Sequence, residues 1–250
     1  MAGRDQMSTS FGAVAGTYEA GRPDYPWEAV GWMLEPALDG DRPLRVADVG
    51  AGTGKLTRVV AAGRAEVVAI DPDPAMLAQL RDTVPGVPTF VGTAEQLPLP
   101  AASVDAVVLG QAWHWVDVAP ASAEIGRVLR SGGVLGLVWN LRDDRDPWVR
   151  RMTEVMHGSN AENMMDAGGP TVEAPFDGLE SEVWDWARPM TAEQLWAMMR
   201  SRSYIITASP ADRGAIEERF AAVLAERPEL AAGGTIDLPY RTHAFRARRP

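Results

Sequence analysis

The sequence contains no cysteine and has histidine at only three positions, His114, His157 and His243. Without cysteine, disulfide bonds and thiolate ligands for a metal are excluded. The three histidines are not spaced as a pair of metal ligands. We therefore expect no metal site, and the chemistry of the chain must come from other residue types.

Long apolar runs are missing as well, and no stretch approaches the length that crosses a bilayer. Residues 1–16 have no apolar signal core, so we expect a cytoplasmic protein. The chain has 250 residues, of which 46% are hydrophobic and 23% charged. These values are typical of a globular protein with a full core, and the length suits a single domain.

Positive charge is in deficit, since 24 lysines and arginines face 34 aspartates and glutamates, for a net charge of −10. Such a surface argues against nucleic acid or an anionic membrane as the main partner. Lys55 is the sole lysine. We expect a small-molecule substrate and a monomer or homodimer.

The centre of the chain alternates short β-like runs with helical patterns, which is typical of βαβ units and a parallel sheet. We predict a Rossmann-like, doubly wound α/β fold with a mostly parallel seven-stranded sheet whose last strand is antiparallel. Strands are expected at 44–50, 65–71, 87–92, 104–112 and 133–140, and helices at 27–38, 55–63, 73–84 and 119–130, the last ending at "SGG".

After residue 140 this alternation stops. We expect a helix at 146–158, a loop through 178, a strand at 182–190, helices at 191–203 and 210–227, and a final strand at 234–248. The whole chain then forms one domain, with an N-terminal cap in 1–40, a cofactor-binding core in 41–140 and a helical, substrate-side part in 141–250.

A glycine-rich turn, "DVGAGTGK", follows the first strand of this core. A phosphate-binding P-loop would need glycine at Val49 and serine or threonine at Leu56, so both ends of that motif fail. The dinucleotide pattern would need glycine at Lys55, where the third glycine allows close packing of helix on strand. Nucleoside triphosphates and NAD are both disfavoured.

An acidic residue, Asp71, ends the next strand about twenty residues later, which is the spacing of a carboxylate that binds ribose hydroxyls. The turn of Gly50, Gly52 and Gly54 then needs to admit only a compact amino-acid group beside bare backbone. S-adenosylmethionine meets that description, because the turn offers carbonyl and N–H groups to its ammonium and carboxylate.

Successive segments also resemble, in order and spacing, the motifs of class I S-adenosylmethionine-dependent methyltransferases. The likeness is greatest to the branch that includes quinone-biosynthesis and trans-aconitate methyltransferases, and it covers roughly residues 11–140. The segments that carry it are "VADVGAGTG", "AIDPDPAML", "VGTAEQLPLPAASVDAVVLGQAWHW" and "EIGRVLRSGGVLGLVWN".

This resemblance implies a set of residues that bind the cofactor. In it, the methionine part lies on the glycine turn, the ribose on an acidic residue, and the adenine on the residues that follow. The implied residues are Tyr18, Gly50, Ala51, Gly52, Asp71, Pro72, Met76, Ala94, Glu95, Gln111 and Ala112. Tyr18 would close over the methionine end of the cofactor.

Several of these residues have simpler interpretations. Asp71 would serve equally well as a helix N-cap, Glu95 as an exposed loop acid, and Tyr18 as an aromatic that pins the terminal segment. Asp48 lies inside a buried strand, where an unpaired carboxylate is costly. We expect Asp48 to accept hydrogen bonds from amides of the turn.

On the acceptor side, the resemblance and the position after the fourth strand indicate His114 and Trp115, with Tyr25, Asn140, Arg142 and Trp196 as further substrate-binding residues. His114 would be a general base or a hydrogen-bond donor, and Tyr18 a second catalytic candidate. Arg142 would bind a carboxylate, or pair on the surface with Asp143 or Asp144. The tryptophans 113, 115, 139 and 196 would form an aromatic wall, although Trp139 suits the core better.

The leading hypothesis is methyl transfer from S-adenosylmethionine to a small organic molecule, such as an aromatic or indole-type specialised metabolite, which leaves S-adenosylhomocysteine. Carboxyl O-methylation of a small acid is the alternative. A non-catalytic nucleoside-binding protein and an NAD-dependent oxidoreductase are further alternatives.

Overall fold

The structure is a computed structural model, and it describes residues 23–39, 42–63, 65–156, 159–202, 205 and 208–250. Most of the expected N-terminal cap, including Tyr18, lies outside the described residues. Among the described residues, no helix is both long enough and apolar enough to span a bilayer.

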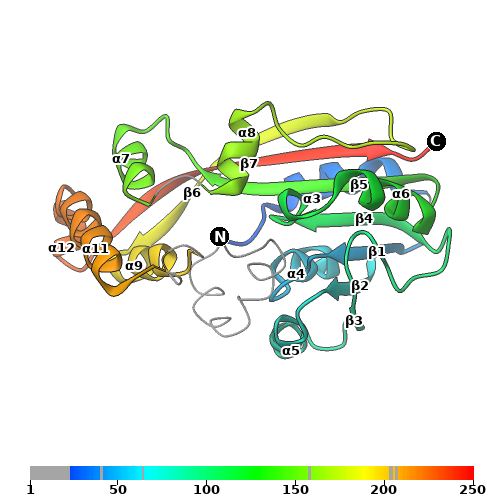
Figure 1. Ribbon diagram of the computed structural model, residues 1–250, viewed down its shortest axis with the longest axis horizontal. Coiled ribbons are helices and arrows are strands. Elements are labelled where there is room, and N and C mark those ends of the chain that lie inside the picture. The colour runs from blue at the N-terminus through cyan, green and yellow to red at the C-terminus, as the bar shows by residue number, and fades with distance from the viewer. Residues whose placement is uncertain (1–22, 40–41, 64, 157–158, 203–204, 206–207) are drawn as a thin grey trace.

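A single seven-stranded sheet forms the centre of the molecule, in the order β3-β2-β1-β4-β5-β7-β6 (Figure 1). The pairs among the first five strands are parallel, whereas β7 is antiparallel to both of its neighbours. This is the predicted doubly wound sheet with an antiparallel last strand. The strands are β1 (Leu44–Val49), β2 (Ala65–Asp71), β3 (Thr89–Val91), β4 (Val104–Gly110), β5 (Leu129–Arg142), β6 (Glu180–Thr191) and β7 (Thr235–Arg248).

Helices cover both faces of the sheet, because the central strands carry apolar side chains on both faces. On one face, α3 (Trp27–Leu34), the 3₁₀ helix η2 (Glu35–Ala37), α4 (Lys55–Ala62) and α5 (Pro74–Thr83) pack against β1, β2 and β5. On the other face lie the 3₁₀ helix η3 (Trp113–Trp115), α6 (Val118–Val128) and α8 (Asn160–Asp166). Because β1, β2, β4 and β5 are parallel, their carboxyl ends lie together at one end of the sheet.

Two expectations for the chain after residue 118 are wrong. The helix ends at Val128, and "SGG" is part of β5, which starts at Leu129 opposite Val104; the pairing shifts register at this point, as a β-bulge does. The expected loop after residue 158 contains α8. Its capping box, Ser159 with Glu162, is a helix-start signal that the sequence does carry.

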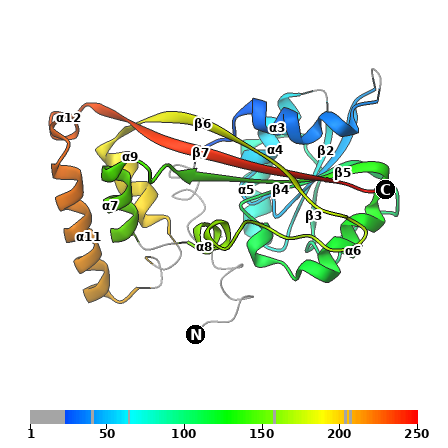
Figure 2. The same ribbon diagram turned by 90° about the horizontal axis from the view of Figure 1, so that it is seen from above.

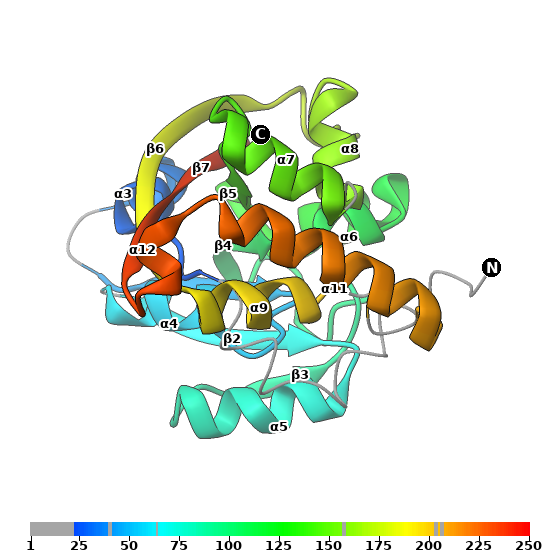
Figure 3. The same ribbon diagram turned by 90° about the vertical axis from the view of Figure 1, so that its left-hand side faces the viewer.

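The C-terminal third forms a second apolar core beyond the edge of the sheet. The long ends of β6 and β7 extend from the sheet to a group of helices, α7 (Pro147–Val155), α9 (Ala192–Arg200), α11 (Pro210–Ala225) and α12 (Pro228–Ala231), as Figure 2 shows. Figure 3 views this group from its outer side. Phe220, Met152 and Leu238 are fully buried in it. This group of helices lies beyond the carboxyl end of β5 (Figure 2).

We predict that the turn at Gly54 tolerates no side chain. Gly54 has φ +91°, and an added Cβ would lie 2.8 Å from Leu80 Cγ. Gly54→Ala should lower the free energy of unfolding by about 2–4 kcal/mol, from left-handed strain together with overpacking. Urea denaturation measures this loss.

Gly86→Ala is the matched control, because Gly86 has φ +90° and open space where its Cβ would stand. It should cost only about 1–2 kcal/mol, the strain alone. Equal losses at the two positions would contradict the packing argument.

Candidate functional site

The glycine turn between β1 and α4 adopts a conformation that only glycine accepts readily. Gly50, Gly52 and Gly54 all have positive φ, of 68°, 55° and 91°. A Cβ on Gly50 would lie 2.7 Å from that of Ala112, whereas one on Gly52 would meet nothing within 4 Å. The turn thus lies against the segment after β4 at Gly50 and borders open space at Gly52.

The Asp71 carboxylate holds this turn in place from the end of β2. Its Oδ2 accepts the Gly52 N–H and its Oδ1 accepts the Asp73 N–H, both at 2.8 Å. Burial raises the pKa of Asp71, and the two backbone N–H groups oppose that rise. The N-cap of α5 is Asp73, which accepts from Ala75, so the helix-cap interpretation of Asp71 is wrong. Each carboxylate oxygen keeps capacity for a further donor.

Asp48, near the end of β1, is fully buried. Its Oδ2 accepts from the Thr57 hydroxyl at 2.5 Å, and its Oδ1 has no hydrogen-bond partner among the described residues. The expected side-chain partners were amides of the glycine turn, but the hydroxyl that binds Asp48 belongs to α4. Burial raises the pKa of Asp48 to about 7, with Asp71 adding to the shift and Thr57 opposing it.

An open cavity of about 470 Å³, here the turn cavity, lies beside these groups. The glycine turn, Asp48 and the ends of β4 and β5 line it, together with Pro23 and Tyr25. Tyr25 packs on the end of β4, where a Cβ on Gly110 would lie 2.6 Å from its hydroxyl. The predicted residues Gly50, Ala51 and Gly52 therefore line one cavity with Gln111, Asn140 and Tyr25.

Residues 23–26 are held over the turn by ionic contacts. The Asp24 carboxylate pairs with Arg58 at 2.7 Å and with Lys55 at 3.4 Å. The Asn140 side-chain amide donates to the Asp24 carbonyl at 3.1 Å. Burial opposes ionisation of Asp24, but Arg58 and Lys55 outweigh it and lower the pKa. The sole lysine thus binds an acidic residue of the segment above the turn.

Gln111, directly after β4, is a non-glycine residue with φ +56°. Such a conformation is costly, and it is common where a side chain must be aimed at a site. The Gln111 side-chain amide donates to the Asn140 carbonyl at 2.8 Å, which holds the two residues together.

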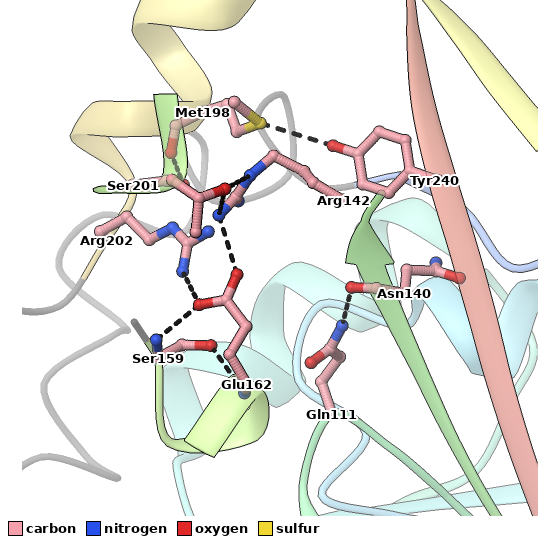
Figure 4. A network of polar contacts seen from close by, with 10 residues as sticks. Gln111, Asn140, Arg142, Ser159, Glu162, Met198, Ser201, Arg202 and Tyr240 are labelled. Atoms are coloured by element: carbon pink, nitrogen blue, oxygen red, sulfur yellow. Dashed lines mark hydrogen bonds and ion pairs between the residues drawn. The ribbon is translucent and has the colours of Figure 1, made fainter. Parts of the chain in front are cut away.

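Gln111 and Asn140, with Pro23, also line a second cavity of about 400 Å³, here the polar cavity. Its other walls come from the end of β5, α8, the end of α9 and β7, as Figure 4 shows. The remaining lining residues are Leu141, Arg142, Ser159, Glu162, Met198, Arg202 and Tyr240. The two cavities are neighbours that share Pro23, Gln111 and Asn140 in their walls.

Arg142 is buried in the wall of the polar cavity, 8% exposed. It pairs with Glu162 at 2.8 Å and donates to the Thr153 hydroxyl at 3.2 Å. The alternative of a surface pair with Asp143 or Asp144 is therefore wrong. Burial raises the pKa of Glu162, but Arg142, Arg202 and Ser159 outweigh that and hold it below its usual value.

His114 and Trp115 lie in η3, with ring centroids 5.0 Å apart, and neither lines the turn cavity or the polar cavity. The Trp139 indole donates to His114 Nδ1 at 3.3 Å. Trp139 is fully buried, as expected of a core residue.

The four tryptophans do not form an aromatic wall. Trp113 and Trp139 belong to the core beneath the sheet, whereas Trp196 packs on Phe220 in the second core, with ring centroids 5.0 Å apart. Trp196 therefore lines neither the turn cavity nor the polar cavity.

The residues expected around adenine lie along the ends of β2 and β3. Met76 and Ala94 are buried, each 4% exposed, and Pro72 directly follows Asp71. Glu95 accepts the N–H of Asp117 at 2.9 Å, at the start of α6, so it is not merely a solvent-exposed acid.

Residue-by-residue reasoning missed Ser159, Glu162, Arg202 and Tyr240. The capping box at 159–162 was a usable signal for α8, which presents Glu162. No local pattern indicates Arg202 or Tyr240, because only tertiary packing brings α9 and β7 to the cavity.

Comparison with known proteins finds relatives over the whole chain. A family model described as a methyltransferase domain matches residues 47–137. An uncharacterised methyltransferase of Mycobacterium bovis is 44% identical over 244 residues, covering 98% of this chain and 97% of that protein. An uncharacterised methyltransferase-like protein of Schizosaccharomyces pombe is 31% identical over 245 residues, covering 96% of this chain and 95% of that protein.

Solved structures agree on the fold. A putative type II methyltransferase of Anaeromyxobacter dehalogenans superimposes with a TM-score of 0.64 at 29% identity, covering 91% of this chain and 96% of that one. A phosphoethanolamine N-methyltransferase of Haemonchus contortus, solved with S-adenosylhomocysteine, superimposes with a TM-score of 0.55 at 15% identity. The match covers 100% of this chain and 61% of that one. At that identity the second likeness concerns the fold alone.

We predict that Asp48 makes stability depend on pH. Its pKa is raised from 3.8 to about 7 in the folded chain, so the folded state holds the proton more tightly than the unfolded state. This contribution is complete below about pH 4 and is lost as pH rises to about 7. Asp48→Asn should remove this loss of stability between about pH 4 and pH 7. Urea denaturation at several pH values measures the free energy of unfolding.

Asp82→Asn, at an exposed aspartate of α5, is the control and should keep the wild-type profile. Parallel profiles for wild type and Asp48→Asn would refute the assignment.

Proposed function

The chain belongs to the class I S-adenosylmethionine-dependent methyltransferases, and we propose that it methylates a small organic molecule bound in the polar cavity. The observation that carries this proposal is the wall that the two cavities share at Pro23, Gln111 and Asn140. A methyl donor in the turn cavity and an acceptor in the polar cavity would meet there. S-adenosylmethionine supplies an electrophilic methyl group on a sulfonium. The chain therefore mainly has to align the acceptor atom with this methyl group and to keep water away from both.

The residues around the turn cavity suit this methyl donor. The partnerless Asp48 Oδ1 is a buried acceptor beside the glycine turn, and an ammonium group would satisfy it. Gly52 leaves the open space that an amino-acid group needs. The Asp71 oxygens would accept the ribose hydroxyls in addition to the two backbone N–H groups.

The other cofactor contacts are proposed on the family resemblance. Pro72 and Met76 would lie against adenine, with Ala94 and Glu95 at its edge. Gln111 and Ala112 would line the methyl end. Tyr18 would cover it, in a segment outside the described residues.

Residues 23–26 form part of the wall of the turn cavity. Pro23 and Tyr25 line the cavity, and Asp24 fastens the segment through Arg58 and Lys55. We propose that this segment covers the donor while the acceptor enters from the polar cavity. A closed site keeps water from competing with the acceptor.

His114 lines neither cavity, and its hydrogen bond with Trp139 bears on which of its two expected roles it could have. Because Nδ1 accepts from Trp139, a neutral His114 carries its proton on Nε2 and is a donor there. This favours a hydrogen-bond donor over a general base. An acceptor that is already ionised needs no base.

Between the two acceptor classes, the polar cavity favours a small acid over an aromatic or indole-type compound. Its wall contains Arg142, a residue suited to a carboxylate, whereas Trp113, Trp139 and Trp196 are packed in cores. Carboxyl O-methylation of a small acid is therefore the second candidate function. Arg142 would hold one carboxylate of the acid, and the methyl group would go to another.

Two measurements test the proposed function. Calorimetric titration should show that S-adenosylhomocysteine binds and NADH does not. Mass spectrometry of reactions with candidate acids, phenols and indoles should show the gain of one methyl group. Absence of heat with S-adenosylhomocysteine would refute the function.

We predict that Asp71→Ala weakens binding of S-adenosylhomocysteine by about a hundredfold. The change removes a charged acceptor for two hydroxyls, and hydrogen bonds to charged groups contribute about 1.5–3 kcal/mol each. It also frees the Gly52 N–H and loosens the turn. Calorimetry gives the dissociation constant.

Asp73→Asn is the control, because asparagine also caps a helix and should keep the affinity within about threefold. A near-normal affinity of Asp71→Ala would remove Asp71 from the ribose site.

A further inference from the structure

Among the described residues that line the polar cavity, two carry positive charge and one carries negative charge. Arg142 and Arg202 are 8% and 5% exposed, and both contact the single carboxylate of Glu162, at 2.8 and 3.8 Å. Glu162 is the only acidic residue among the described residues that line this cavity. Two guanidinium groups thus contact the same carboxylate in a poorly solvated place, where the desolvation of charge is costly.

Part of the hydrogen-bonding capacity of Arg142 is unused. Its Nε and Nη2 donate to Thr153 and Glu162, whereas Nη1 donates to no described residue. A guanidinium presents its N–H groups in a planar fork that suits a carboxylate or a phosphate. Arg142 thus has a donor left for an anion in the cavity whose wall it forms.

Neutral donors surround the same space (Figure 4). The Ser159 hydroxyl accepts the Glu162 N–H, and its own interaction with the Glu162 carboxylate helps to lower the pKa of that group. Among the described residues, the Tyr240 hydroxyl donates to the Met198 sulfur at 3.4 Å, a weak acceptor that a ligand oxygen would replace readily. An anion would therefore find charged and neutral donors from β5, α8, α9 and β7.

The charged end of the cavity is separate from the wall shared with the turn cavity. Asn140 lines both cavities, and Arg142 stands two residues further along β5, about 7 Å away at the usual rise of a strand. Because Arg142 and Arg202 line the polar cavity and not the turn cavity, a group bound between them would lie outside the turn cavity. It would hold one end of a molecule whose other end lies at Gln111.

We propose that the methyl acceptor carries an anionic group, a carboxylate or a phosphate, that Arg142 and Arg202 bind while another atom of the same molecule receives the methyl group. This inference rests on the proposed function. The accepting atom uses a lone pair to form its bond to the methyl carbon, the electrons of the broken carbon–sulfur bond stay on sulfur, and any proton of the acceptor leaves to solvent. The anchoring anion is unchanged, so the product keeps it.

Glu162 then sets the affinity for this anion. As the counter-ion of both arginines it competes with the ligand, and its removal strengthens binding. Glutamine serves in a capping box as glutamate does, so Glu162→Gln should preserve the start of α8. A network that is only structural would gain no ligand affinity from this change.

The experiment titrates inorganic phosphate and, separately, succinate into the protein saturated with S-adenosylhomocysteine. Four proteins are compared by calorimetry: the wild type, Arg202→Gln, Glu162→Gln and Arg145→Gln. Arg145 is an exposed arginine paired with Asp143 and Asp185, which makes it the matched control outside the cavity. Thermal unfolding of each variant verifies that it is folded.

We expect saturable binding of at least one probe, about tenfold weaker or more in Arg202→Gln, stronger in Glu162→Gln and unchanged in Arg145→Gln. Binding of phosphate alone or of succinate alone identifies which anion is preferred. No saturable binding, or equal affinity in all four proteins, overturns the proposal. S-adenosylhomocysteine is first titrated into each protein without ligand, so failure of the proposed function is recognised separately by the absence of that binding.

Discussion

The rest of the site depends on one buried carboxylate, that of Asp71. By accepting the N–H of Gly52 and of Asp73, it joins the turn after β1 to the start of the helix after β2. These two contacts fix the strained glycines at the carboxyl edge of the sheet, beside the turn cavity. The remaining walls, from Gln111 and Asn140, come from strand ends that the same parallel sheet brings to this edge.

Much of the fold is predictable because its signals are local. Alternating apolar runs and helix caps, such as Asp73 before α5, indicate elements within a few residues. The errors arise where tertiary pairing overrides local pattern. "SGG" is typical of a helix end, yet pairing between Val104 and Leu129 draws the segment into β5. The helix α8 was missed because glycine, asparagine and methionine obscured its capping box.

The two halves of the candidate site differ in the same way. Gly50, Gly52 and Asp71 are close in sequence, and their spacing alone indicates a nucleoside-type ligand. The charged and hydroxyl residues of the polar cavity are spread along the chain from Arg142 to Tyr240, so no spacing connects Arg142 with Arg202 or Tyr240. Composition also misled, because the tryptophans that suggested an aromatic site are mostly used to fill two cores.

The contact between Asp24 and the sole lysine has a practical consequence. Because Lys55 is the only side chain in the sequence with a primary amine, an amine-reactive reagent modifies a single side-chain position. The Lys55 side chain is 12% exposed and its amine is paired with Asp24, so the acylation rate of this amine measures its accessibility beside the turn. The chain thus carries its own chemical probe of access to the glycine turn, with no engineered label.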